Sequence, residues 1–170
     1  MARTSAVKAT DRYERKREAI LDAATPILNR LGVKGLTLGV AAAAVDLSTT
    51  SVTYYFRRKD DLAAACMLRG VEAMQAMAEA ALQAPTPEER LHRLLGLYLE
   101  RMRQAAVREA PPLPLLSEIR ALNQPQRSEV GDAFGRMFRK VRAVFDDPAL
   151  GFLTRGRKTA RTHMVLEQLF

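Results

Sequence analysis

Apolar side chains recur every three or four residues along most of the chain, which is the spacing of helices buried on one face. No stretch alternates between apolar and polar residues as a half-buried strand would. The pattern therefore predicts an all-α protein with one long helix near the N-terminus, two short helices and several longer ones. Their expected ranges are 11–31, 38–45, 48–56, 60–84, 86–109, 115–123, 125–145 and 157–170.

Several helix boundaries carry signals of their own. The run Thr86–Glu89 combines a hydroxyl cap, a proline at the first helical position and a glutamate that can reach back to the cap. Gly32 and Gly35 are expected to end the first helix, and the proline-rich stretch Pro111–Pro114 separates two later ones. Pro26 lies inside the first helix, where it either bends the helix or breaks it.

The basic residues are concentrated at the front of the chain. The 170 residues include 27 Lys and Arg against 19 Asp and Glu, a formal net charge of +8. Residues 1–60 carry eleven basic and six acidic side chains. Such an excess favours anionic partners, nucleic acid first. The basic run from Arg12 to Arg17 is open to two interpretations, a solvated helix face or an arm that touches DNA.

Composition and cysteine usage narrow the class of protein. A hydrophobic content of 48% is enough for a packed core. No uncharged apolar run reaches the ~18 residues that a membrane span needs, and the N-terminus lacks the apolar stretch of a signal peptide. Cys66 is the single cysteine, so it can form neither an intramolecular disulfide nor a cysteine-based zinc site, and we expect it to be buried. The expected location is the cytoplasm.

Residues 37–56 have the pattern of a helix-turn-helix, with two short helices joined by a three-residue turn. Thr37 and Ser48 stand where N-cap hydroxyls belong. Asp46, in the turn, is expected to adopt a positive φ, which aspartate tolerates better than most residues. The second helix is rich in hydroxyls and tyrosine rings, groups that can reach base edges and phosphates in a major groove.

The order of landmarks in this region resembles the N-terminal domain of TetR-type (tetracycline-repressor-like) transcriptional regulators. The resemblance spans roughly Arg15 to Met67. It rests on Ile20-Leu21-Asp22-Ala23-Ala24, Gly32, Leu36-Thr37, Ser48 and Val52-Thr53-Tyr54-Tyr55-Phe56-Arg57-Arg58-Lys59-Asp60-Asp61-Leu62. Two positions depart from the family pattern: Asp46 replaces the usual turn glycine, and Thr53 stands where many members have a tyrosine, which here comes one place later.

The resemblance implies an all-α dimeric repressor with a three-helix DNA-binding head, residues 1–60, and a helical ligand-binding and dimerisation body, residues 61–170. It also implies roles for individual residues. Thr37 and Gly39 would meet phosphates at the first short helix, while Tyr55 and Lys59 would clamp phosphates at the end of the second. Bases or backbone would be contacted from the second short helix by Thr49, Thr50, Ser51, Thr53 and Tyr54.

The body is expected to hold a cavity for an apolar or amphipathic small molecule between the helices 60–84, 86–109 and 125–145. Flexible, bulky side chains at helical spacing suit such a ligand, although the same residues are explained most simply as core. The candidate lining residues are Met67, Met74, Met77, Tyr98, Met102, Phe134 and Phe138. A bound ligand would favour a body conformation in which the two heads no longer match successive major grooves.

The last predicted helix, 157–170, presents an apolar surface that is large for exposure to water. Its members are Ala160, Met164, Val165, Leu166, Leu169 and Phe170. The resemblance implies a homodimer interface of two C-terminal helices from each subunit, of which this chain reaches only the start of the first. We therefore expect a body truncated at its C-terminus that dimerises poorly. The alternative is that this helix folds back onto its own body.

Two other classes of function compete with the regulator. An enzyme would need a nucleophile–base pair or clustered carboxylates, and none is recognisable, so we assign no catalytic residue, no metal site and no cofactor. A DNA-binding architectural or protein-interaction module without a small-molecule ligand stays open. The sequence favours a one-component repressor that binds a palindromic double-stranded DNA operator as a homodimer.

Overall fold

The computed structural model describes residues 2–147 and 154–169. Within these ranges every regular element is a helix, which confirms the predicted fold class. The elements are α1 (Ala2–Gly35), α2 (Leu38–Ala44), α3 (Thr49–Tyr55), α4 (Lys59–Ala81), α5 (Pro87–Ala106), the 3₁₀ helix η1 (Leu116–Ala121), α6 (Gln126–Ala143) and α7 (Arg155–Leu169).

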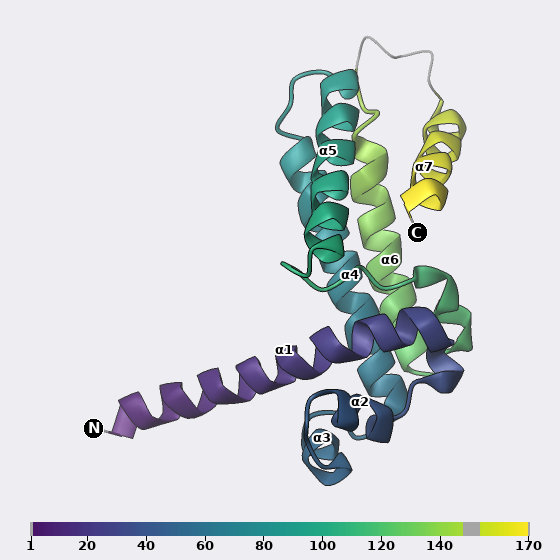
Figure 1. The fold of residues 1–170 in the computed structure, drawn as a ribbon. Coiled ribbons are helices and arrows are strands. Elements are labelled where there is room, and N and C mark those ends of the chain that lie inside the picture. Colours follow the sequence, from purple (N-terminus) through teal and green to yellow (C-terminus); the bar gives the residue numbers. More distant parts are fainter. Residues whose placement is uncertain (1, 148–153, 170) are drawn as a thin grey trace.

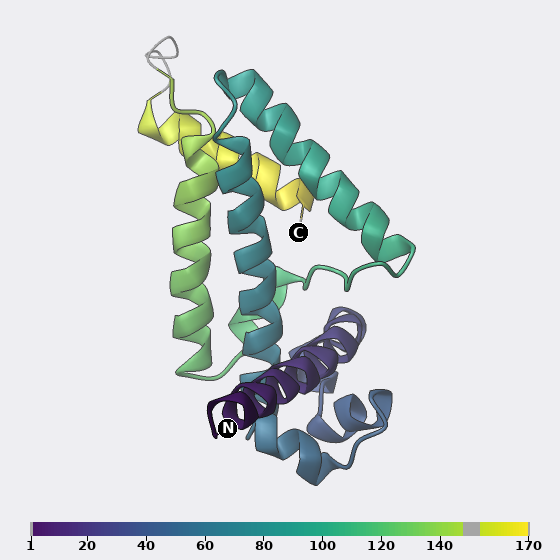
Figure 2. The ribbon, with the colours of Figure 1, turned by 90° about the vertical axis from the view of Figure 1, so that its left-hand side faces the viewer.

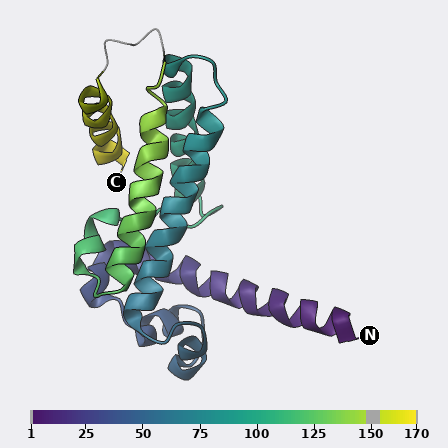
Figure 3. The same ribbon diagram turned by 180° about the vertical axis from the view of Figure 1, so that it is seen from behind.

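The helices form a small head and an elongated body that share α4. This helix runs from the head into the body beside α6, and α1 crosses it near its lower end (Figure 1). α2 and α3 lie below α1 and complete the head. In the body, α5 diverges from α4 toward its own C-terminus, and α7 lies in the half far from the head (Figure 2). Seen from behind, the N-terminal half of α1 projects clear of the other helices (Figure 3).

The first helix differs from its prediction in two respects. It begins at Ala2 instead of near residue 11, so the expected start was wrong. The preceding residues contain no glycine or proline, and alanine, arginine and lysine are good helix formers, so nothing stops the helix from extending. The helix also continues through Pro26, which rules out the break there. The regular geometry ends at Gly32, where φ is +67°, close to the expected stop.

The predicted capping signals are confirmed. The side chains of Thr37, Ser48 and Thr86 each accept a hydrogen bond from a backbone N–H three residues later. Glu89 reaches back to the backbone N–H of Thr86, which completes the capping box of α5. Asp46 has φ +53°, as the turn requires. Most of the later boundaries lie within three residues of their expected positions, because caps and prolines act locally.

The main core lies around α4. Its buried side chains face α1 on the head side and α5 and α6 in the body. Cys66 is 0% exposed and its thiol lies against the carbonyl oxygen of Leu21, which confirms the expected buried role. Burial raises the pKa of Cys66 to about 11. A thiol in this position remains protonated and behaves as a small apolar group.

The C-terminal helix α7 packs against its own body. Leu166 and Leu169 are buried in the core that includes α6, and the Tyr98 hydroxyl of α5 donates a hydrogen bond to the Leu169 carbonyl. For these two leucines the alternative is confirmed, in which the helix folds back onto its own body. Met164 is 67% exposed on the same helix. Phe170, also expected on that face, lies outside the described residues.

Candidate nucleic-acid interface

The two short helices of the head are held at a fixed angle by small residues and by the turn between them. Ala41, Ala42 and Val52 are at most 1% exposed where α2 crosses α3. Methyl-sized side chains allow the two backbones to approach closely. The turn is closed by the Leu47 backbone N–H, which donates to the Ala42 carbonyl at 3.0 Å. This arrangement buries one side of α3 and leaves the other side outward.

The outward side of α3 carries the predicted base-contacting residues. Thr49, Thr50, Thr53 and Tyr54 are exposed, and Tyr54 is 74% exposed. Thr50 and Tyr54 are four residues apart and therefore share one face. The Thr53 hydroxyl donates to the Thr49 carbonyl at 2.9 Å, so its proton is used within the helix.

Ser51 lies deeper than the other hydroxyl residues of α3. It is half-buried, and its hydroxyl lies 2.8 Å from that of the cap residue Ser48. A serine in this position stabilises the start of the helix and offers less to a ligand than its neighbours do. Thr49 and Thr50 are thus freer than Thr53 and Ser51 to meet a base edge.

Tyr55 belongs to a cluster of three tyrosines. Its ring centroid lies 4.8 Å from that of Tyr13 on α1 and 5.2 Å from that of Tyr54, and the Tyr13 and Tyr54 centroids are 5.8 Å apart. Tyr55 is half-buried as a result. Sequence reasoning missed Tyr13, because 41 residues separate it from Tyr54 and no periodic signal links them.

The predicted phosphate-contacting residues lie on either side of α3, at the start of α2 and where α3 leads into α4. Thr37 and Gly39 are exposed at the start of α2. The Lys59 ammonium donates to the Val33 carbonyl at 3.2 Å, so this side chain also ties the start of α4 to the end of α1. Arg57 is exposed beside it. Together these groups border the outward face of α3 with donors and positive charge.

The predicted ligand-pocket residues do not line a single space. Met67 and Met74 are fully buried in the core, whereas Met102 is 44% exposed on α5. Phe134 and Phe138 lie on α6 with centroids 6.4 Å apart, and His163 of α7 lies 4.7 Å from Phe138. The remaining two, Met77 and Tyr98, are half-buried against the core.

An open groove of about 650 Å³ lies between η1, α6 and α7. Of the predicted pocket residues, Phe134 is the one found in its described lining. Arg120, His163 and Glu167 provide polar groups beside the apolar ones. The remaining lining residues are Leu116, Ser117, Ile119, Gly131 and Leu166.

One wall of this groove belongs to a segment that is tied to the head by side-chain hydrogen bonds. We call residues 113–126, which include η1, the strap. At one end, the Asn29 amide of α1 donates to the Leu113 carbonyl at 2.8 Å, and its oxygen accepts from the Leu115 N–H at 2.9 Å. In the middle, the Glu118 carboxylate accepts from the Val33 N–H at 3.1 Å.

The other end of the strap is held by the start of α4. Asn123 donates to the Asp60 carboxylate at 2.6 Å, and Gln126 donates to Asp61 at 2.5 Å. Both aspartates are in the first turn of the helix, where negative charge is favourable. The strap therefore connects the groove directly with both helices that support the head.

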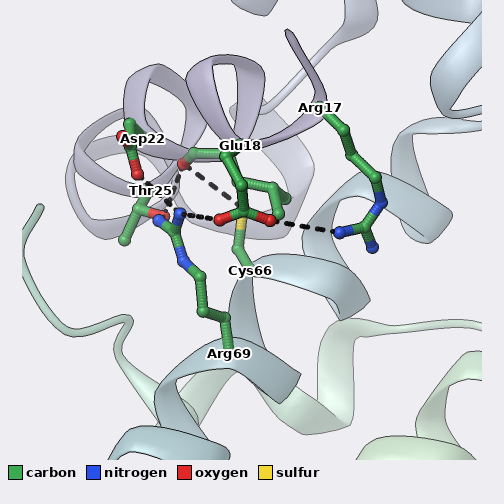
Figure 4. A network of polar contacts seen from close by, with 7 residues as sticks. Arg17, Glu18, Asp22, Thr25, Cys66 and Arg69 are labelled. Carbon is green, nitrogen blue, oxygen red and sulfur yellow. Dashed lines mark hydrogen bonds and ion pairs between the residues drawn. The ribbon is translucent and has the colours of Figure 1, made fainter. Parts of the chain in front are cut away.

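A second link between head and body is centred on Arg69 of α4 (Figure 4). Its guanidinium lies 2.6 Å from the Asp22 carboxylate and 3.2 Å from that of Glu18, both on α1. It also donates to the Thr25 hydroxyl at 3.1 Å. Because several hydrogen bonds converge on one planar group, this contact fixes the crossing of α1 and α4.

Two further observations on the described part of the chain concern metal-binding groups and membrane-spanning helices. Within residues 2–147 and 154–169, no three His, Cys, Asp or Glu side chains are grouped so that they could hold a metal ion. No described helix is long and apolar enough to cross a membrane.

Comparison with solved structures identifies the fold. The TetR-family transcriptional regulator PfmR from Thermus thermophilus superposes with a TM-score of 0.69 at 20% identity, over 88% of this chain and 81% of that chain. A TetR-family regulator from Bordetella parapertussis gives a TM-score of 0.71 at 19% identity, over 91% and 80%. AibR, in a complex with isovaleryl coenzyme A and operator DNA, gives 0.67 at 17%, over 90% and 83%.

The chain thus has the fold of TetR-family transcriptional regulators, with a helix-turn-helix head on a helical body. No protein-family model matches the sequence, and the curated proteins contain no match either. The likeness to these regulators is therefore one of three-dimensional architecture, and function has to be inferred from the side chains of this chain.

Proposed function

We propose that this protein is a transcriptional regulator that binds duplex DNA through its head. The observation that carries the proposal is the outward face of α3, where Thr50 and Tyr54 project from a capped helix whose other side is packed into the core. A helix of this kind fits the major groove, where hydroxyl groups can read base edges. The basic excess of residues 1–60 suits the phosphates.

The bordering residues take the positioning roles in this proposal. Thr37 and Gly39 approach one phosphate strand from the start of α2, while Tyr55 and Lys59 approach it from the other side of α3. Contacts of this kind set the register of a protein on DNA without reading sequence. Thr49, Ser51 and Thr53 belong to α3, which is the recognition helix in this proposal, and lie between these two groups of phosphate contacts.

The proposed assembly is a homodimer on a palindromic operator. One head of this size offers few phosphate contacts, and two heads about one helical turn of DNA apart double them. The AibR complex, which has the same fold, contains operator DNA. Repression would follow from occupation of the operator.

The proposed effector is an apolar or amphipathic small molecule that binds in the body. The groove between η1, α6 and α7 joins apolar side chains to Arg120 and His163, and the AibR complex contains an acyl thioester. A ligand there would press on the strap, whose hydrogen bonds reach Asn29 and Asp60 in the two helices that carry the head. Ligand binding would then shift the population toward a head spacing that does not fit the operator.

Selection from a library of random-sequence duplexes tests the proposal. The wild-type protein should enrich a consensus with two related half-sites. Thr50→Ala and Tyr54→Phe should each relax one position per half-site, with a loss of roughly 1–3 kcal/mol of discrimination there. Ser128→Ala, which removes an exposed hydroxyl on α6, should leave the consensus unchanged.

Two outcomes of this selection would distinguish a failure of the proposed DNA binding from a failure of the roles given to Thr50 and Tyr54. A wild-type protein that enriches no sequence would contradict the proposed function. An unchanged consensus in both α3 variants would leave DNA binding in place but remove Thr50 and Tyr54 from the residues that read bases.

A further inference from the structure

The first helix extends far beyond the part that packs into the head. From residue 11 onward the first buried position is Ile20, and between residues 11 and 19 only Tyr13 and Arg17 are half-buried. The helix nevertheless continues to Ala2 and projects away from the body (Figures 1 and 3). We call residues 2–19 the arm. An isolated helix of this length is marginal in water, so further contacts would stabilise it.

The arm is attached to the recognition helix at Tyr13. The ring of Tyr13 packs on Tyr55 and meets the ring of Tyr54 edge to face at a centroid distance of 5.8 Å. Tyr54 belongs to the outward face of α3. The arm therefore leaves the head at the border of the surface that is proposed to face DNA.

The charged side chains of the arm lie on different faces of the helix. Arg12 and Lys16 are four residues apart and share one helix face. Both are exposed, and neither forms an ion pair with another described residue. Glu18 and Asp22 are instead paired with Arg69 of α4. Asp11 is paired with Arg15 on the arm itself, and Glu14 is two residues from both Arg12 and Lys16 and therefore on another face of the helix. Arg12 and Lys16 thus leave one face of the arm positively charged.

The partner that suits this surface is a polyanion. No large apolar side chain is exposed between residues 11 and 19, so a protein groove or a lipid interior would gain little area from contact. At 1.5 Å per residue, the 18 residues of the arm span about 27 Å. This length corresponds to roughly eight base pairs of duplex, whose phosphates repeat every 3.4 Å along a strand.

We infer that the arm is a second DNA-binding element, which contacts phosphates in the duplex that flanks each half-site. The inference rests on the proposed function, because α3 must first place the head on DNA. Tyr13 is a positioning residue that holds the arm against the recognition helix, and Arg12 and Lys16 make the contacts. The arm adds affinity and footprint length without reading sequence.

The double variant Arg12→Gln/Lys16→Gln tests the charge contacts on the duplex selected above, prepared with long and with trimmed flanks. Loss of two phosphate contacts should lower the slope of log affinity against log salt by about 1.8. Between 50 and 200 mM salt, the affinity of the wild-type protein should therefore fall about twelvefold more than that of the variant. On the trimmed duplex the two proteins should behave alike. Arg93→Gln, which removes an exposed charge on α5, is the matched control and should keep the wild-type slope.

Tyr13→Ala keeps every charge of the arm and should shorten the hydroxyl-radical footprint at the flanks, whereas Tyr13→Phe retains the ring contacts and should restore it. Circular dichroism checks that each variant stays helical. A wild-type slope and an unshortened footprint in the double variant would overturn the inference while leaving the proposed function intact. Failure of the wild-type protein to bind any duplex would overturn both.

Discussion

Helices α4 and α5 are similar in length but differ sharply in burial. α4 has eleven buried residues, whereas α5 has one, Leu94. The reason is the number of neighbours: α4 is packed against α1, α5 and α6, while the main neighbour of α5 is α4. Leu99 and Met102 of α5 remain 65% and 44% exposed. α4, whose sequence is rich in alanine and other apolar residues, is thus the central helix of the molecule, and the more charged α5 is an outer wall.

Because α4 is buried and α5 is exposed, effects on stability and effects on ligand binding should be separable in the body. Substitutions in α4 should act on the whole fold, because its side chains join the head to the body. Substitutions in α5 should be tolerated by the fold, so any effect they have on ligand or partner binding can be measured in a folded protein. Variants in the two helices test this difference.

The largest effect is expected from truncating a methionine in each helix. Met74→Ala in α4 should lower the free energy of unfolding by about 2–5 kcal/mol, because the fully buried side chain leaves a cavity. Met102→Ala in α5 should change it by less than about 1 kcal/mol. Urea unfolding followed by circular dichroism measures both. Equal losses would mean that α5 is packed as tightly as α4.

Glycine-to-alanine changes should have opposite signs in the two helices. A methyl group on Gly70 of α4 would overlap the Pro114 ring of the strap, so Gly70→Ala should cost about 1–3 kcal/mol of packing before any gain in helix propensity. Gly96 of α5 has nothing within 4 Å, and Gly96→Ala should stabilise the protein by about 1 kcal/mol. Urea unfolding followed by circular dichroism measures the change in the free energy of unfolding for both variants. A stabilised Gly70→Ala variant would show that the strap moves aside freely.

The smallest effect is expected at the start of α5. Thr86→Ala removes the side-chain acceptor of the capping box and should cost about 1 kcal/mol. Thr86→Ser keeps the hydroxyl and should stay close to the wild type. Amide hydrogen exchange in the first turn of α5 should accelerate in the alanine variant. Unchanged exchange would indicate that packing of α5 on α4, and not its cap, holds this end.

The parts of the site that the sequence predicted are those fixed by local interactions. Thr37 and Ser48 cap their helices through bonds to residues three positions later, and Asp46 takes a positive φ inside a three-residue turn. The outward orientation of Thr50 and Tyr54 follows from the helical period once Val52 is in the core. None of these features depends on a distant segment.

The parts that sequence reasoning missed all join distant segments. Tyr13 meets Tyr54 across 41 residues, and Asn29 holds the strap across 84. Neither residue has a periodic or motif signal, since a polar or aromatic side chain on a helix surface looks the same whether or not a partner comes near. The lining of the groove by Phe134 also depends on where the strap and α7 lie.

By itself, the sequence determined that the chain is helical, where most helices begin and end, and which side chains of α3 face outward, because these properties arise from hydrogen bonds and spacings within a few residues. Only the tertiary structure decided which helices pack on α4, that Leu166 and Leu169 turn toward their own body, and that the strap connects the groove with the head. Those outcomes depend on which helices become neighbours, and packing between distant segments leaves no periodic trace in either one.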